Sequence, residues 1–133
     1  MPPEIPRSPY KSVGGLRRLL HACRYSLQGL AAALRHEAAF RQETALALIL
    51  VPLSIWVGRT TLEAMVLLGV IVLLLVVELL NSAVEAVADA VTVDHHPLLG
   101  RAKDLGSAAV MLTLLFAGGV WACVLIERFV LQP

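Results

Sequence analysis

The chain has 133 residues, which is enough for one domain. Hydrophobic residues make up 58% of it and charged residues 16%, with a mean hydropathy of +0.77. A soluble domain of this length cannot bury that much apolar surface, because small domains have a high surface-to-volume ratio. The net charge of +1 gives no sign of a nucleic-acid partner. The composition therefore predicts an integral membrane protein, and a helical one, because Pro and Gly are sparse within the apolar runs.

The segment before residue 38 has two parts. Residues 1–15 carry four prolines among charged residues, and we expect a disordered N-terminal tail there rather than a signal peptide, which would need an apolar stretch. From about 16 to 36, leucines recur every three or four residues, with arginines filling much of the remainder. This pattern predicts an amphipathic helix that lies on an anionic membrane surface or packs on the protein's own bundle.

Three apolar runs follow, and we expect them to span the membrane at about 38–57, 62–91 and 104–127. The first run reaches the roughly 20 residues that a bilayer requires only if it starts near residue 38. We expect Pro52 to kink it and Gly58 to end it. In the third run, the pair Gly118 and Gly119 could allow close helix approach. Residues 16–133 are thus predicted to form one all-α membrane domain, with a surface helix and three transmembrane helices.

The basic residues predict the orientation of these spans. Of the 11 Lys and Arg residues, seven precede residue 42 and two more, Arg101 and Lys103, lie in the 92–104 loop. With three spans these nine share one side of the membrane, whereas Arg59 and Arg128 lie on the other. The N-terminus is therefore expected in the cytoplasm and the C-terminus outside it.

Polar residues interrupt the second span at Glu78, Asn81, Glu85 and Asp89. These four fall within an arc of roughly 80° on one helix face, and such a face avoids lipid. Carboxylates are ligands that suit Mg²⁺, which in turn suggests a nucleotide polyphosphate. A buried carboxylate can also act as a general base, and Glu78 is the deepest of the row. A polar seam that fixes helix association and a proton relay or transporter subunit are the non-enzymatic alternatives.

Further candidates lie near the predicted cytoplasmic ends of the spans. Glu37 lies just before the first span, and Lys103 and Asp104 open the third, where the lysine could meet phosphate oxygens. The pair His95 and His96 is a weaker signal for a nucleotide. The sequence contains no GxxxxGKS or GxxxxGKT, no HExxH and no CxxC motif. Any phosphoryl transfer would therefore depend on positioning and electrostatics on an unusual scaffold.

Three segments resemble the motifs of the bacterial integral-membrane diacylglycerol kinases: 37–43 (EAAFRQE), 78–89 (ELLNSAVEAVAD) and 100–110 (GRAKDLGSAAV). The resemblance covers about residues 16 to 127. It implies a homotrimeric bundle in the bacterial inner membrane, with a periplasmic C-terminus and with active sites at protomer boundaries. The implied reaction is MgATP-dependent phosphorylation of the primary hydroxyl of diacylglycerol, which gives phosphatidic acid and ADP.

The resemblance also implies roles for individual residues. Glu78 would be the catalytic base, Glu37 and Glu85 would hold Mg²⁺, and Asn81 and Asp89 would support the site. The residues implied to bind ATP are Arg18, Tyr25, Glu37, Glu85, Asp94, His95, His96, Lys103 and Asp104. Those implied to bind the lipid are Ser26, Arg41, Glu43, Glu78 and Ser107. Because Pro97 after the histidine pair resembles the undecaprenol kinase branch of the family, a polyprenol acceptor is the alternative substrate.

Overall fold

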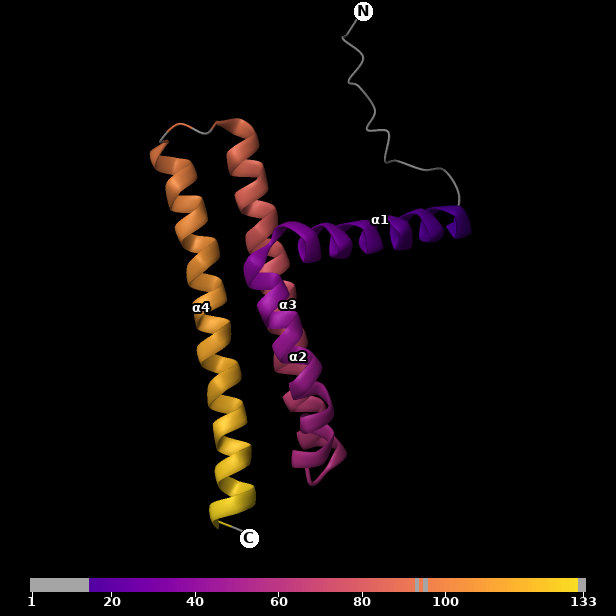
Figure 1. Cartoon of the computed structure of the whole chain (residues 1–133), viewed down its shortest axis with the longest axis vertical. Coiled ribbons are helices and arrows are strands. Elements are labelled where there is room, and N and C mark those ends of the chain that lie inside the picture. Colours follow the sequence, from indigo (N-terminus) through magenta and orange to yellow (C-terminus); the bar gives the residue numbers. More distant parts are fainter. Residues whose placement is uncertain (1–14, 93, 95, 132–133) are drawn as a thin grey trace, which may run out of the picture.

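The computed structural model describes residues 15–92, 94 and 96–131. Within these residues every regular element is a helix (Figure 1). The elements are α1 (Gly15–His36), α2 (Ala38–Val57), α3 (Thr61–Val91), α4 (Pro97–Ile126) and a π-helical turn, η1 (Glu127–Leu131). The predicted all-α architecture is confirmed, whereas residues 1–14 of the expected tail lie outside the described residues.

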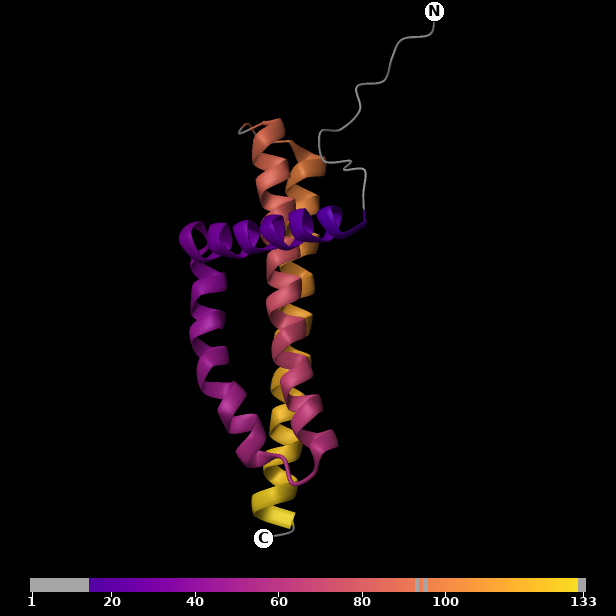
Figure 2. The ribbon, with the colours of Figure 1, turned by 90° about the vertical axis from the view of Figure 1, so that its right-hand side faces the viewer.

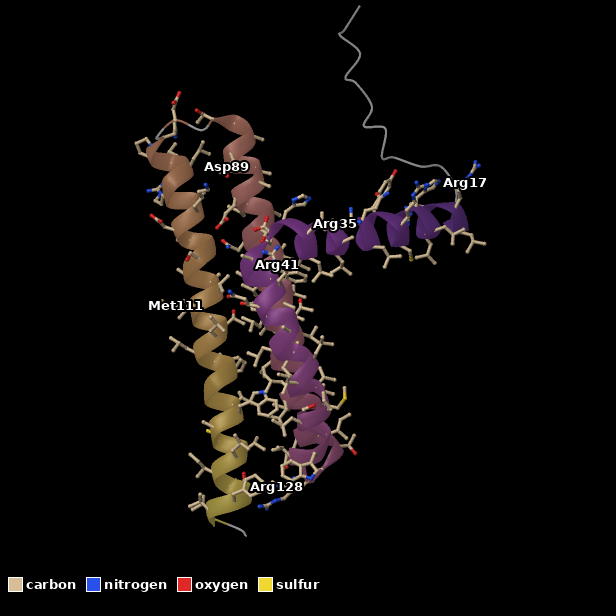
Figure 3. The ribbon with its side chains drawn as sticks, viewed as in Figure 1. Arg17, Arg35, Arg41, Asp89, Met111 and Arg128 are labelled. Atoms are coloured by element: carbon tan, nitrogen blue, oxygen red, sulfur yellow. The ribbon has the colours of Figure 1, made fainter. Side chains whose placement is uncertain are left out.

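Helix α1 projects sideways from the other three helices, which run along one another (Figures 1 and 2). The chain changes direction at Glu37, whose extended backbone (φ −99°, ψ 113°) separates α1 from α2. The leucines of α1 are largely exposed, with Leu16 at 73% and Leu27 at 67%. Arg17 projects on the side away from the direction in which α2 runs (Figure 3). This arrangement is typical of a helix that rests on a membrane surface.

Helices α2, α3 and α4 are each long and apolar enough to cross a membrane. Pro52 lies inside α2, and α2 is visibly curved in Figure 2. Gly58 caps α2 as expected. Thr60 begins α3 by accepting a hydrogen bond from the Glu63 backbone N–H at 3.1 Å. Helix α4 starts at Pro97, about two turns before the expected span start at 104, because proline suits the first turn of a helix.

The apolar core lies where α2, α3 and α4 meet, toward the α2–α3 loop. Leu67 is fully buried there, and Val57, Val70 and Trp121 pack in the same cluster. The close approach of α4 to α3 occurs elsewhere, at Gly106, where an added Cβ would overlap Asn81 Oδ1. The expectation for Gly118 and Gly119 is not met within the described chain, because a Cβ at either one would meet no atom within 4 Å.

Two arginines join η1 to the end of α2 and to the α2–α3 loop, and we call Arg59 and Arg128 with their partners the arginine end. The Arg128 guanidinium donates to the backbone carbonyls of Trp56 and Val57 and lies 5.0 Å from the centroid of the Trp56 ring. Arg59 donates from its side chain to the Glu127 carbonyl at 3.0 Å and from its backbone N–H to Glu63 Oε2 at 2.8 Å. These bonds place cations at helix C-termini, where the helix dipole favours positive charge.

Candidate active site

Four carboxylates approach one another where α1, α2 and α3 meet, and we call Glu37, Glu43, Glu78 and Glu85 the acidic cluster. Glu78 is its buried member, with 4% of its surface exposed. Glu37, Glu43 and Glu85 all lie close enough to interact electrostatically with Glu78. Glu37 comes from the turn between α1 and α2, Glu43 from α2, and the other two from α3. The fold therefore brings together acids that are far apart in the sequence.

Asn81 links the acidic cluster to α4. Its Nδ2 donates to Glu85 Oε1 at 3.2 Å, one helical turn further along α3. On the other side, the absence of a side chain at Gly106 lets α4 approach the Asn81 amide. Asn81 thus contacts the Glu85 carboxylate and lies at the close approach of α4.

Several buried polar atoms of this region have no hydrogen-bond partner among the described residues: Glu43 Oε2, Thr44 Oγ1 and Asn81 Oδ1. A buried polar atom without a partner costs about 1–3 kcal/mol, so such atoms are uncommon unless a ligand completes the site. All three are oxygens, the donor type that Mg²⁺ prefers.

The acidic cluster provides only part of a metal coordination shell. No group of three or more His, Cys, Asp or Glu side chains in the described part of the chain is placed to hold a metal by itself. Mg²⁺ is usually held by one or two carboxylates together with substrate phosphates and water. The donor set of Glu37 and Glu85 therefore fits Mg²⁺ that arrives with a nucleotide better than it fits a permanent metal.

A second polar cluster lies at the α3–α4 turn, around a pocket of about 160 Å³. Lys103 Nζ forms an ion pair with Asp89 Oδ1 at 2.7 Å, and Asp94 and His96 line the same pocket. The structure thus brings together three of the residues predicted to bind ATP, while His95 lies outside the described residues. One lysine and one histidine beside solvent-accessible acids could receive polyphosphate oxygens.

A third region with predicted site residues is a largely apolar crevice of about 590 Å³ between α1 and α3. Ser26 and Glu37, both predicted site residues, line it together with His36 and Ser82. Sequence reasoning missed the last two residues. Their only signal is position, because His36 precedes Glu37 and Ser82 follows Asn81 directly.

The remaining predicted residues join none of these regions within the described chain. Arg18 and Tyr25 lie on α1, where Tyr25 stacks on His21 with ring centroids 6.3 Å apart. Arg41 Nη1 donates to the Arg35 carbonyl at 3.1 Å near the end of α1. Asp104 and Ser107 are exposed on α4. One chain therefore presents separate groups of predicted residues instead of one closed site.

The fold and these clusters define a multi-pass helical membrane protein with a carboxylate-rich site beside its surface helix. The family described as prokaryotic diacylglycerol kinase matches residues 24–125. Three bacterial proteins named diacylglycerol kinase are similar over nearly their whole length. That of Haemophilus influenzae is 46% identical over 116 residues, which cover 87% of this chain and 98% of the relative. The Pseudomonas aeruginosa protein is 44% identical over 119 residues, with 90% and 97% covered. The Escherichia coli K12 protein is 41% identical over 115 residues, with 86% and 94% covered.

The chain belongs to the prokaryotic diacylglycerol kinase family. It is a bacterial multi-pass membrane enzyme, a lipid kinase of the diacylglycerol kinase type that transfers phosphate to an alcohol acceptor. The alternative of a non-enzymatic relay or transporter subunit is thereby set aside.

Proposed function

We propose that this enzyme uses MgATP to phosphorylate the primary hydroxyl of diacylglycerol, releasing phosphatidic acid and ADP. The observation that carries the proposal is the buried Glu78 carboxylate, surrounded by three further carboxylates at the end of α1. A base in this position can meet a lipid that lies in the membrane and a nucleotide that arrives from water. Family membership supports the same reaction class.

Glu78 would accept the proton of the lipid hydroxyl as its oxygen attacks the γ-phosphorus. A new O–P bond forms, the bond between the γ-phosphorus and the bridging oxygen breaks, and ADP leaves with that oxygen. Most of the rate enhancement for this kind of transfer comes from positioning and charge stabilisation. Glu37 and Glu85 would hold Mg²⁺, which when bound neutralises charge on the phosphates.

The nucleotide would lie between the acidic cluster and the pocket at the α3–α4 turn. The geometry that supports this placement is the Asp89–Lys103 ion pair, because it holds the lysine beside Asp94 and His96. Arg18, Tyr25, His95 and Asp104 are proposed to contact ATP on the strength of the motif match. Ser26, Arg41, Glu43 and Ser107 are proposed to lie near the lipid headgroup on the same basis.

We further propose a homotrimer with active sites at protomer boundaries. The separation of the predicted residues into several groups on one chain supports this assembly, because a neighbouring chain could complete each site. The excess of basic residues on one side supports a cytoplasmic N-terminus and a periplasmic C-terminus in the inner membrane.

ADP release by purified protein in mixed micelles with MgATP tests the proposed reaction. Dioleoylglycerol, undecaprenol and no added lipid are compared, with radiolabelled ATP to identify the product. We expect diacylglycerol to stimulate ADP release most and the label to appear in phosphatidic acid. Preference for undecaprenol would replace the acceptor and keep the chemistry. Folded protein that releases no ADP with either lipid would overturn the proposal.

A further inference from the structure

We infer that Trp121 ends a cavity for one acyl chain of the lipid acceptor and limits how far that chain extends into the protein. The inference rests on the proposed function, because it assumes that a lipid hydroxyl reacts at Glu78. It concerns a different part of the molecule, the apolar space between α2, α3 and α4.

The cavity has a volume of about 270 Å³ and walls from all three membrane helices. Apart from Glu43 and Trp121, its walls are made of Gly, Ala, Leu and Ile side chains. A dry apolar cavity of about 150 Å³ can bind a molecule the size of benzene. A space nearly twice as large, with walls of this kind, suits a segment of hydrocarbon chain better than water or a polar group.

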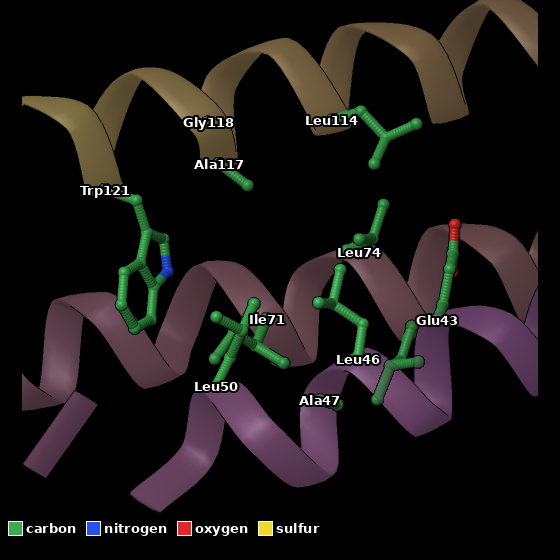
Figure 4. Close-up of a pocket in the computed structure, with 11 residues that line it drawn as sticks. Glu43, Leu46, Ala47, Leu50, Ile71, Leu74, Leu114, Ala117, Gly118 and Trp121 are labelled. Atoms are coloured by element: carbon green, nitrogen blue, oxygen red, sulfur yellow. The ribbon is translucent and has the colours of Figure 1, made fainter. Parts of the chain in front are cut away.

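The two ends of the cavity differ in chemistry. Figure 4 shows Glu43 at one end and Trp121 at the other, with Leu74 and Leu114 between them. Glu43 interacts electrostatically with Glu78, so this end of the cavity adjoins the proposed reaction centre. A lipid whose hydroxyl lies at Glu78 can therefore extend an acyl chain into the cavity from the Glu43 end.

Trp121 closes the opposite end. It is only 9% exposed and packs in the core cluster with Val57, Leu67 and Val70, so the helices are tightly packed beyond it. Ile71 lines the cavity between Trp121 and Glu43, and it lies seven residues before Glu78 on α3. Seven helical residues correspond to about 10 Å, so an acyl chain can extend at least this far from Glu78 before it meets Trp121.

The hydrogen bonding of the Trp121 indole is a further observation on this end of the cavity. Its Nε1 is buried and has no hydrogen-bond partner in the described ranges of the chain. A buried indole N–H usually finds a partner, so this ring is not placed by hydrogen bonding within the protein. A hydrocarbon chain offers no acceptor to this N–H, so the ring would contact a bound acyl chain through its apolar face.

Filling the cavity tests the inference through substrate choice. Ala117→Leu adds bulk to the cavity wall, and Ala122→Leu makes the same change at an exposed position of α4 that does not line the cavity. We expect Ala117→Leu to lower kcat/KM for dioleoylglycerol by about tenfold while leaving dihexanoylglycerol within twofold. Ala122→Leu should leave both values unchanged. Equal effects of Ala117→Leu on both acceptors would overturn the inference.

A binding experiment keeps the test independent of turnover and of the folding of the leucine variant. The chain has two tryptophans, so Trp56→Phe leaves Trp121 as the only one. Without ATP, diacylglycerol with brominated acyl chains should quench Trp121 fluorescence saturably and in competition with unbrominated diacylglycerol. Phosphatidylcholine with the same brominated chains should quench much less at equal mole fraction.

The outcomes separate the two proposals. Equal quenching by both brominated lipids would mean that bulk lipid contacts Trp121. No quenching by either lipid would mean that a second copy of the chain covers it. Either result would show that the inference is wrong. Failure of the proposed function would be recognised differently, as wild-type protein that releases no ADP.

Discussion

The arginine end and the acidic cluster handle charge in opposite ways. At the arginine end, both guanidinium groups donate to backbone carbonyls, and the Arg128 group also lies 5.2 Å from the Phe129 ring. In the acidic cluster, like charges face one another, and Glu43 Oε2 has no hydrogen-bond partner within the described chain. The first region is complete as a single chain, whereas the second lacks the groups that would balance it.

This difference assigns stability to the arginine end and catalysis to the acidic cluster. Clustered carboxylates destabilise the folded chain, and their persistence requires compensating interactions elsewhere. The tight core around Leu67 and the bonds of the arginine end provide such interactions. A cation bound with nucleotide would neutralise the cluster. Changes in the acidic cluster should therefore alter catalysis most, and changes at the arginine end should alter stability alone.

The largest effect is expected from Glu78→Gln. The amide keeps the size of the side chain but cannot accept the hydroxyl proton, so kcat should fall roughly a hundred- to ten-thousand-fold. Steady-state kinetics at varied MgATP measure the change. The matched control is Glu63→Gln, the same substitution on the same helix at the arginine end, where Glu63 Oε2 accepts a hydrogen bond from the Arg59 backbone N–H. It should leave kcat unchanged.

Glu85→Gln and Glu37→Gln separate metal binding from base catalysis at the same cluster. These variants should raise the KM for MgATP, whereas Glu78→Gln should change it little. Normal turnover by Glu78→Gln would remove that residue from the catalytic role.

The next effect concerns stability. Arg128→Gln removes the charged donor that binds the carbonyls at the end of α2, and hydrogen bonds from a charged group contribute about 1.5–3 kcal/mol. We expect a lower unfolding temperature in detergent, with kcat per folded molecule unchanged. Arg101→Gln, on the exposed surface of α4, is the stability control and should leave the unfolding transition in place. A loss of kcat without loss of stability would contradict the division between the two regions.

Much of the fold follows from local sequence pattern. The leucine spacing of 16–36 and the apolar runs at 38–57 and 62–91 match α1, α2 and α3 within a residue or two, because amphipathicity and hydropathy are properties of neighbouring residues. Helix α4 begins seven residues before the expected span start at 104, because a helix can extend beyond the apolar residues that cross the membrane.

The candidate site was predictable only in part. The common face of Glu78, Asn81 and Glu85 follows from helical geometry, and their meeting with Glu37 follows from the family motifs. The cavity that ends at Trp121 and the contact of Gly106 with Asn81 depend on how α4 packs against α3. The bond from Arg128 to Val57 joins residues 71 positions apart, and no local pattern specifies such a contact.

The smallest effect tests the link between α4 and the acidic cluster. In Gly106→Ala the new methyl group overlaps Asn81 Oδ1, so the amide must turn and its 3.2 Å bond to Glu85 is lost. Because a typical hydrogen bond contributes about 0.5–1.5 kcal/mol, the KM for MgATP should rise roughly two- to tenfold. Gly119→Ala is the control, since its methyl group would meet no described atom within 4 Å.

A double-mutant cycle shows whether Gly106 acts through Asn81. Asn81→Ala should raise the KM for MgATP by a similar factor, and Gly106→Ala should then add nothing further, because the group it displaces is already absent. Additive effects would mean that the methyl group disturbs the helix packing directly. In that case Gly106 would be needed for the packing of α4 against α3 and not for the orientation of Glu85. Helix α4 would then contribute to stability at this position, and Asn81 alone would contribute to the acidic cluster.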